Sequence, residues 1–474
     1  MKILLINPPA IQTIEESDEP DNPSISIAYL AGYLRSKNID VDVIDGKLER
    51  LNFEQTIERF KKKKYDIVGL TSYTHDVKNA HKLASLIKAI DKKVLTVIGG
   101  VHATAIPYET LEKLPNFDLA VVGEGEYMLY DIIKAVEENK SFKGIEGVYY
   151  REDGQIIPNP VRVREQNLDA LPLPAWDMFP AAKKYQIIGA RGCPNFCSFC
   201  MSPYGRKIMR FRSPENVIQE LEWLINTYHP IQIRFNDETF SHDMERAHKL
   251  LDLIIEKGFH KKTAFVASTR ANKVDYPLLL KIKKANFEFL EIGVETGDPE
   301  IIIKTHKGIT IDQTERAVKL AKKAGLNVGC GFIIGHPGET KETAQKTMDF
   351  MAKLNPKVAA IGLMVPYPGT EVAELAKRGE ANYHLLSTDW EDYNKQIGNA
   401  LEMKNFTRKE MEMMQALGYL KLYYKNARFM DLAKFIWKYK AAGIIFVKKQ
   451  LGFKIKYGGD STNQLGPIGQ ISTA

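Results

Sequence analysis

Cysteine is scarce in this chain of 474 residues, which contains only four. So few thiols cannot form the disulfide framework of a small secreted protein, and they favour a reducing compartment. The opening stretch, MKILLINPP, also lacks a long apolar run. It is too short for a secretory signal or for a membrane span of about 18 apolar residues. We therefore expect a cytoplasmic protein.

A strong charge of one sign is also missing. Lysine and arginine number 66 and aspartate and glutamate 59, so the net charge is +7. The excess is not gathered into the basic stripe that is typical of nucleic-acid binding, and no nucleic-acid partner is expected. One run, Lys61 to Lys64, is expected to end a helix as a solvated face, because the helix dipole favours lysine there.

The first part of the chain alternates short apolar runs with amphipathic helical patterns. Such alternation predicts parallel strands joined by helical crossovers. Five strands at this spacing predict an α/β fold with a flavodoxin-like, Rossmann-type sheet. The expected strands are KILLIN, VDVID, DIVGLT, VLTVIGG and DLAVVG, and the expected helices are SIAYLAGYLRSKN, FEQTIERFKKKK, DVKNAHKLASLIKAI and EYMLYDIIKAVEEN.

A second alternating region follows a different kind of segment. GVYYREDGQIIP predicts a hairpin that turns at Asp-Gly. LPLPAWDMFP is too rich in proline for an ordinary helix and is interpreted as a semi-rigid linker. Six or so β/α units after it predict a TIM-like β/α barrel, partial or full. The expected strands are QIIGAR, IQIRFND, TAFVAST, FLEIGV, NVGCGFII and AAIGLMVPY, and the expected helices cover 214–228, 243–257, 275–285, 311–325 and 340–354.

These patterns predict five segments along the chain. The flavodoxin-like domain and the barrel are the two large ones, and a helical, basic C-terminal region ends in a flexible tail. The predicted boundaries are 1–140 for the flavodoxin-like domain, 141–183 for the hairpin and linker, 184–395 for the barrel, 396–459 for the helical basic region and 460–474 for the tail.

Three of the four cysteines lie in one decapeptide, RGCPNFCSFC, as Cys193, Cys197 and Cys200. A structural zinc site usually closes four ligands, and no matching second pair of cysteines is present. A 4Fe-4S cluster takes one thiolate per iron, so three thiolates leave one iron open. Three incidental cysteines and a three-ligand zinc site remain alternatives. Cys330 lies in the apolar run VGCGFII and is interpreted as a buried strand residue rather than a fourth ligand.

The sequence CPNFCSFC is similar to the C-x3-C-x2-C signature of radical S-adenosylmethionine enzymes, including the aromatic Phe199 before the last cysteine. The resemblance implies that Cys193, Cys197 and Cys200 hold a 4Fe-4S cluster. The open iron of this cluster would chelate S-adenosylmethionine, and an electron from it would yield a 5′-deoxyadenosyl radical that abstracts hydrogen from a substrate. The cofactor carries this chemistry, and the protein positions it.

The resemblance also implies residues that contact S-adenosylmethionine at the ends of barrel strands. In FNDETF, Asp237 and Glu238 are placed to meet the ammonium group, although a solvated turn is the alternative. In ASTRAN, Ser268 is implied to meet the ribose and Arg270 the carboxylate, because an arginine fork suits a carboxylate. Two further residues that end strands are implied to line the same site, Glu295 in EIGVETGD and Gly335 in GFIIGHPGET.

The domain ahead of the barrel resembles that of the cobalamin-binding class of this family. That class includes radical C- and P-methyltransferases and the anaerobic magnesium-protoporphyrin monomethyl ester cyclase. The resemblance implies that Thr71 and Ser72 of TSYTH, and Gly99 and Gly100 of IGGVHAT, contact cobalamin. Both stretches follow strands at the carboxyl edge of the sheet, where doubly wound folds bind ligands.

The chain departs from the class in one motif. Many cobalamin domains carry Asp-x-His-x-x-Gly after the first strand, whereas this chain reads NPPAIQTIEES there and has no histidine. We therefore expect a cobalt without a histidine ligand from that motif, which suits methyl transfer to a carbon radical. His75 and His102 lie on nearby loops, and we interpret them as polar loop residues rather than cobalt ligands.

Residues 427–459 interleave lysines with aromatic and aliphatic residues. Such a segment can cap the barrel with its lysines outward, or it can lie on a membrane surface and serve a lipid-like substrate. We favour the cap.

Taken together, the motifs predict a cobalamin-dependent radical methyltransferase that acts on an unactivated carbon. The alternatives are a radical oxidoreductase or cyclase without net methylation and a non-catalytic nucleotide- or metal-binding regulator. The expected cofactors are a 4Fe-4S cluster, S-adenosylmethionine and cobalamin. The expected partners are a small-molecule or lipid-like substrate and an electron donor such as flavodoxin or ferredoxin.

Overall fold

The computed structural model describes residues 1–9, 22–202, 205, 208–395, 398–440 and 443–444. The chain divides into two compact units. Unit 1 holds the described residues within Met1–Ile11, Glu19–Pro194 and Met201–Pro230, and unit 2 holds those within Asn195–Cys200 and Ile231–Ala474.

Unit 1 is built on a sheet with the order β2-β1-β3-β4-β5-β6-β7. Its first five strands are parallel, and the order 2-1-3-4-5 is that of the flavodoxin-like fold. The prediction of a flavodoxin-like domain is therefore confirmed. The seven strands are β1 (Lys2–Asn7), β2 (Asp40–Asp45), β3 (Ile67–Thr71), β4 (Leu95–Gly99), β5 (Leu119–Val121), β6 (Val148–Glu152) and β7 (Gln155–Pro158).

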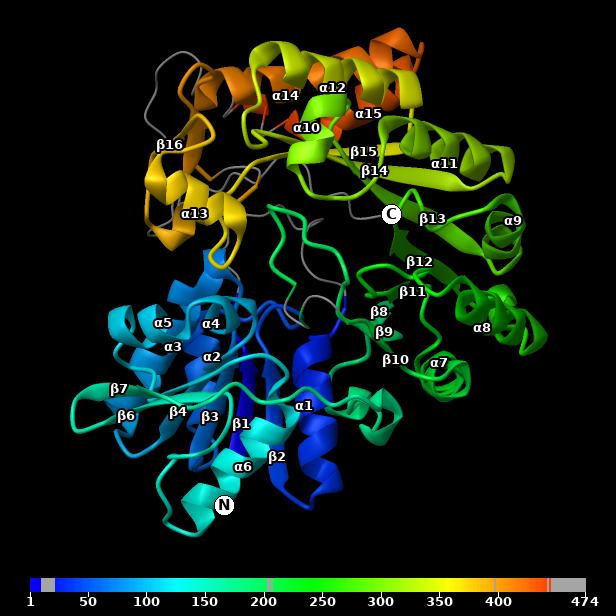
Figure 1. Ribbon diagram of the computed structural model, residues 1–474. Helices are drawn as coiled ribbons and strands as arrows, with labels where there is room; N and C mark the ends of the chain where they lie inside the picture. The colour runs from blue at the N-terminus through cyan, green and yellow to red at the C-terminus, as the bar shows by residue number, and fades with distance from the viewer. Residues whose placement is uncertain (10–21, 203–204, 206–207, 396–397, 441–442, 445–474) are drawn as a thin grey trace. The chain divides into compact units, whose positions relative to one another are not determined.

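Helices connect the parallel strands of unit 1, and Figure 1 shows them around the sheet in blue and cyan. Short stretches such as Ile3–Ile6 are fully buried, because strands covered on both faces need apolar residues at every position. The sequence predicted four of the helices and missed the two short ones after β4. The six helices are α1 (Ile25–Ser36), α2 (Phe53–Phe60), α3 (Val77–Ile90), α4 (Val101–Ala105), α5 (Pro107–Lys113) and α6 (Gly125–Glu137).

The hairpin and the proline-rich stretch have the predicted local structure. Strands β6 and β7 are antiparallel, and Asp153 and Gly154 turn between them with φ of 49° and 78°. The proline-rich stretch, 171–180, holds no α-helix, only the 3-10 turn η4 (Trp176–Met178), and the 3-10 turn η3 (Leu168–Ala170) precedes it. Trp176 is fully buried and its indole N–H donates to Glu220 at 3.0 Å, so this stretch belongs to the core of unit 1.

Unit 1 also holds the elements that flank the cysteine decapeptide. The two-residue strands β9 (Ala190–Arg191) and β10 (Arg210–Phe211) form an antiparallel pair around it. Strand β8 (Lys184–Ile187) precedes them and α7 (Pro214–Tyr228) follows. Helix α7 covers the predicted residues, because Ser213 caps its start by accepting from Asn216 and Pro214 fits its first turn.

Unit 2 contains five parallel strands that are neighbours in the order β15-β14-β13-β12-β11. This arrangement is that of a partial β/α barrel. The strands are β11 (Gln232–Phe235), β12 (Ala264–Thr269), β13 (Phe287–Glu295), β14 (Asn327–Ile334) and β15 (Val358–Leu363); a separate antiparallel pair is β16 (Tyr383–Leu385) and β17 (Leu401–Met403).

The helices of unit 2 alternate with its strands as the sequence predicts. Two short helices, α10 and α13, were not expected, because each spans fewer than nine residues. The helices and turns are α8 (Met244–Glu256), η5 (Phe259–Lys261), α9 (Tyr276–Lys284), α10 (Pro299–Lys304), α11 (Ile311–Lys323), α12 (Lys341–Leu354), α13 (Glu371–Arg378), η6 (Trp390–Asp392), α14 (Arg408–Lys425) and α15 (Phe429–Lys438).

The C-terminal region is helical, and α14 lies along α12 in Figure 1. The side chain of Gln415 donates to the carbonyl of Ile361 at 2.6 Å, and the Tyr419 hydroxyl accepts from the N–H of Ile361 at 3.0 Å. Helix α14, which precedes residues 427–459, therefore packs on β15. The interpretation of residues 427–459 as a cap stays a prediction. Residues 445–459 and the predicted tail, 460–474, lie outside the described residues. None of the described helices has the length and hydropathy that crossing a membrane requires.

Candidate functional site

The cysteine loop begins directly after β9. Gly192 has a φ of 96°, and a Cβ there would stand 2.3 Å from the carbonyl oxygen of Ile208, so this position requires glycine. The next N–H, that of Cys193, donates to Gly205 at 3.1 Å. Cys193 is half-buried, Cys197 is buried and Cys200 is exposed, and none of them is in a disulfide.

Main-chain hydrogen bonds within unit 2 fix the second half of the cysteine loop, residues 195–200. The N–H of Ser198 donates to Thr305 at 2.9 Å, and the carbonyl of Ser198 accepts from Val372 at 3.0 Å. The ring of Phe199 meets the ring of His336 edge-on at 5.5 Å. The main chain that carries Cys197 and Cys200 is therefore held on both sides.

The donor set of the loop fits an iron–sulfur cluster. Three thiols within eight residues of sequence are soft ligands of the kind that such clusters require. No group of three or more His, Cys, Asp or Glu surrounds a single metal position within the described parts of the chain. A cubane takes one thiolate on each iron, so its ligands need not surround a single ion.

Positive charge lies close to Cys197. Burial raises the pKa of its thiol, and the cations of Lys307 and Arg270 oppose this rise. The carboxylate of Glu295 acts in the same direction as burial. Unit 2 thus brings Cys197 together with Arg270 and Glu295, two residues predicted for S-adenosylmethionine.

Arg270 and Glu295 are joined through Lys307, which the sequence analysis missed. The guanidinium of Arg270 donates to the carbonyl oxygen of Lys307, and the ammonium of Lys307 pairs with Glu295. Gly293 makes room for this pair, because a Cβ there would lie 2.5 Å from both the Glu295 carboxylate and the Lys307 nitrogen. No sequence signal marks Lys307, since it lies in a connection between two helices.

The loop after β11 is tied to β12. The N–H of Phe240 donates to the carbonyl of Ser268 at 2.9 Å, and Asp237 in this loop is buried. Glu238 lies beside it and is half-buried. The Ser268 hydroxyl donates to Glu291 at 2.8 Å. The predicted contacts of these residues with the cofactor stay predictions.

Glu291 organises the Ser268 side chain. It accepts two 2.8 Å hydrogen bonds from the fork of Arg234. Burial alone would raise the pKa of Glu291, but the hydrogen bonds and charge of Arg234 hold it below its ordinary value. The carboxylate is therefore ionised when it binds Ser268.

Gly335 follows β14 in a tight turn. Its φ is 102°, and a Cβ would lie 2.7 Å from Met411 and 2.9 Å from Met364. The carboxylate of Glu339 accepts from the N–H groups of Gly335 and His336. Burial raises the pKa of Glu339 to about 8 and lowers that of His336 to about 4. These two fully buried polar side chains were not predicted.

The residues predicted for cobalamin lie together at the carboxyl edge of the sheet in unit 1. The N–H of Ser72 donates to Gly99 at 3.2 Å, and a Cβ on Gly100 would lie 2.6 Å from the Ser72 carbonyl oxygen. Thr71 ends β3 in the same place. The Ser72 hydroxyl is buried and has no hydrogen-bond partner among the described residues. A polar ligand at this edge would satisfy it, so the residues fit cobalamin.

The two histidines near this edge are held by their own neighbours. His102 is fully buried, and its ring nitrogen lies 3.3 Å from the Thr74 hydroxyl. Burial lowers the pKa of His102 to about 4. The ring of His75 stacks on Tyr73 at 6.1 Å. The interpretation of both as polar loop residues stays a prediction.

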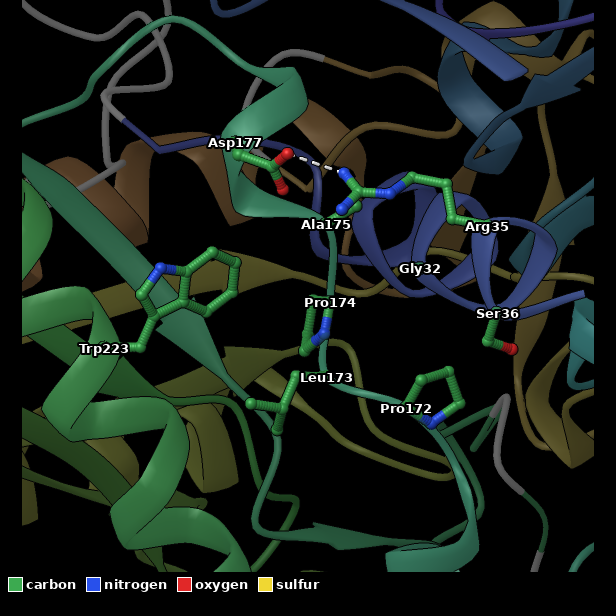
Figure 2. Close-up of a pocket in the computed structure, with 9 residues that line it drawn as sticks. All are labelled: Gly32, Arg35, Ser36, Pro172, Leu173, Pro174, Ala175, Asp177 and Trp223. Carbon is green, nitrogen blue, oxygen red and sulfur yellow. Dashed lines mark hydrogen bonds and ion pairs between the residues drawn. The ribbon is translucent and has the colours of Figure 1, made fainter. Parts of the chain in front are cut away.

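A separate pocket of unit 1, about 680 Å³ in volume, lies where the proline-rich stretch meets α1 (Figure 2). Arg35 and Asp177 form a 2.6 Å ion pair at its wall. Its other side chains are mainly apolar, and Trp223 faces them from α7. None of the predicted cofactor residues is among those that line it.

Comparison with known proteins agrees with this layout. Residues 13–133 match the family model of the B12 binding domain, and residues 187–351 match that of the radical SAM superfamily. The chain is 35% identical over 433 residues to an uncharacterized methyltransferase of Pyrococcus horikoshii, covering 89% of this chain and 92% of that protein.

Two further similarities come from a sequence relative and a solved structure. The anaerobic magnesium-protoporphyrin IX monomethyl ester cyclase of Rubrivivax gelatinosus is 28% identical over 389 residues, which is 78% of this chain and 68% of that one. The radical S-adenosylmethionine methyltransferase TsrM from Kitasatospora setae, solved with cobalamin and a 4Fe-4S cluster, shares the fold with a TM-score of 0.71, 18% identity and coverage of 90% of each chain. The chain therefore belongs to the radical S-adenosylmethionine enzymes that carry a B12-binding domain, as its cysteine signature indicated.

Proposed function

We propose that this enzyme is a cobalamin-dependent methyltransferase that acts on an unactivated carbon. The observation that carries the proposal is that one chain holds both a three-cysteine loop and a flavodoxin-like edge with the unsatisfied Ser72 hydroxyl. The similarity to the methyltransferase of Pyrococcus horikoshii supports it.

Within this proposal the cysteine loop holds the cluster, and residues of unit 2 bind S-adenosylmethionine. Cys193, Cys197 and Cys200 hold the cluster, which supplies the electron that cleaves S-adenosylmethionine. Arg270 is cationic and buried, which suits the carboxylate of the methionine moiety. Asp237 suits its ammonium group.

The remaining predicted residues of unit 2 are proposed to bind the ribose and the nucleoside of S-adenosylmethionine. Ser268 is already oriented by Glu291 and can present its oxygen to a ribose hydroxyl. The turn at Gly335 and its fixed N–H groups shape the wall for the nucleoside, with Glu295 at the end of the neighbouring strand β13 and Glu238 in the loop after β11.

The proposed corrinoid site lies in unit 1. Thr71 and Ser72 offer hydroxyls, and Gly99 and Gly100 leave main chain uncovered for close approach. The corrinoid supplies methyl transfer. An external donor such as flavodoxin or ferredoxin supplies electrons, and the substrate is a small or lipid-like molecule.

Anaerobic reconstitution with iron and sulfide tests the proposal. The wild-type protein should take up a 4Fe-4S cluster, bind corrinoid and release 5′-deoxyadenosine and S-adenosylhomocysteine from S-adenosylmethionine. Cys197→Ala should lose the cluster and both products. Cys330→Ala is the matched control, because Cys330 is buried within β14 and its removal leaves the loop intact.

The products separate the alternatives. Release of 5′-deoxyadenosine without S-adenosylhomocysteine or a methylated product would favour the radical oxidoreductase or cyclase. Failure of the wild-type protein to cleave S-adenosylmethionine in the presence of a strong reductant would contradict both the methyltransferase and the oxidoreductase or cyclase function.

Contact with an anionic lipid surface is part of the proposal for α15. This helix has no buried residues, and Met430 and Trp437, seven residues apart on one face, are 76% and 74% exposed. Phe429 and Ile436 lie on the same face and are also exposed. Lysines beside an exposed apolar face favour an anionic surface.

Vesicle co-sedimentation tests this contact. The double variant Met430→Ser/Trp437→Ser should lose binding to vesicles that contain anionic lipid. The control variant Val163→Ser removes an apolar side chain that is 81% exposed elsewhere and should bind like the wild type. Equal binding of both variants would refute the contact without affecting the proposed chemistry.

A further inference from the structure

A buried ion network in unit 1 underlies the base of the cysteine loop. Arg191 donates to Glu124 at 2.8 Å and to Glu126 at 2.6 Å. Arg210 donates to both oxygens of Glu124, through one nitrogen at 3.1 Å and through the other at a shorter distance. The four side chains are between 3% and 8% exposed. Burial this deep strengthens each pairing, because water does not screen it.

The register of the β9–β10 hairpin places two arginines opposite each other, and Glu124 supplies their counter-charge. Arg191 on β9 and Arg210 on β10 are direct cross-strand partners. Like charges opposite one another destabilise such a pair. The hairpin contains only two residues on each strand, and the N–H of Arg212 beside it donates to the carbonyl of Gly189 at 2.9 Å. The carboxylate of Glu124 accepts from both arginines, offsets their mutual repulsion and links the two strands.

Glu124 is placed for this role rather than for its own helix. It occupies the N-cap of α6, yet its side chain makes no capping hydrogen bond. A capping residue normally accepts from the N–H groups of the first turn. Here the carboxylate of Glu124 accepts from Arg191 and Arg210 instead. Glu126, in the first turn of α6, is favoured by the helix dipole and completes the shell around Arg191.

The hairpin leads directly to the first cysteine. Only Gly192 separates Arg191 from Cys193, and a Cβ at Gly192 would stand 2.3 Å from the carbonyl oxygen of Ile208, so the main chain passes close to β10 there. Any opening of the hairpin therefore moves the main chain of Cys193. We propose that Glu124 is a positioning residue for the cluster loop, which it holds in shape through Arg191 and Arg210. This inference rests on the proposed role of Cys193 as a cluster ligand.

Cluster retention in the full-length, anaerobically reconstituted protein tests the proposal. Glu124→Gln keeps the shape of the side chain and removes its charge. It should lose iron to a chelator about 10-fold faster than the wild type, because Arg210 loses the carboxylate that it pairs with and Arg191 keeps only that of Glu126. It should also change the visible circular dichroism of the cluster, which reports ligand geometry and which a loss of stability alone does not alter.

Graded variants separate positioning from general stability. Glu126→Gln removes one of the hydrogen bonds of Arg191 and should have a smaller effect than Glu124→Gln. Asp118→Asn is the matched control: Asp118 precedes β5, at the opposite end of that strand from Glu124, and pairs with Lys88 at 2.6 Å. It should retain the wild-type spectrum and chelation rate even where it lowers the melting temperature.

The outcomes distinguish failure of the positioning role of Glu124 from failure of the proposed function. A wild-type chelation rate and spectrum in Glu124→Gln would overturn the positioning role and leave the proposed function standing. Equal loss in Asp118→Asn and Glu124→Gln would also overturn it, since stability alone would explain both. If Glu124→Gln does not fold, Arg210→Lys decides in its place, because it keeps the charge and loses the fork that holds both oxygens. Absence of a cluster in the wild-type protein would instead refute the proposed function.

Discussion

Replacing Lys307 by methionine isolates the buried ion pair beside Cys197. The side chains of Lys307 and Glu295 are 7% and 10% exposed. Lys307→Met would leave the carboxylate of Glu295 buried without its partner. Loss of one partner of a buried pair costs about 3–5 kcal/mol. We therefore expect the free energy of unfolding of unit 2 to fall by this amount.

Hydrogen exchange measures this loss in unit 2 alone. A chain with two units need not unfold in one step, so a single melting curve does not assign the change. The amides of β13, Phe287–Glu295, should exchange at least roughly 100-fold faster in Lys307→Met, since each 1.4 kcal/mol is about tenfold. The double variant Glu295→Leu/Lys307→Met removes both charges and should recover most of the protection. Wild-type exchange in the single variant would refute the assignment of a buried, mutually dependent pair.

Three further predictions concern the predicted cobalamin edge and the turn after β14. Gly100→Ala should lower the stability of unit 1 by about 1–3 kcal/mol in urea unfolding, because alanine is strained at a φ of 96° and meets the Ser72 carbonyl. Ser72→Ala should leave stability unchanged or raised while weakening corrinoid binding in a titration, because it removes a buried hydroxyl without a partner. Burial raises the pKa of Glu339 to about 8, so the folded state holds a proton that the unfolded state releases, and stability should fall between about pH 4.5 and 8 by at most about 1.4 kcal/mol per pH unit. Glu339→Gln should abolish that slope, and an unchanged slope would show that other groups cause it.

Much of the fold could be predicted from local patterns. Apolar runs such as Ile3–Ile6 and capped starts such as Ser213–Pro214 act within a few residues, and the elements appear where they indicate. Helices α4 and α5 were missed because VHATAIPYETLEK is short and is interrupted by Pro107. A proline at a helix start and a proline that breaks a helix look alike without the structure.

The site could be predicted only in part. The spacing of Cys193, Cys197 and Cys200 is a local signal, and the glycine turns follow from backbone geometry. The ion pairs that support the site are not local: Arg191 is 67 residues from Glu124 and Arg210 is 86. Such pairs leave no periodic trace in one sequence. They become visible only when the fold brings Glu124, which follows β5, beside the hairpin.

The most direct test of the account is a Mössbauer spectrum of the anaerobically reconstituted, iron-57-labelled protein. Three cysteine ligands leave one of the four irons of a 4Fe-4S cluster without a thiolate. The account predicts that S-adenosylmethionine shifts the signal of that one iron and leaves the other three unchanged. A spectrum that does not respond to S-adenosylmethionine, or one without a 4Fe-4S cluster, would contradict it.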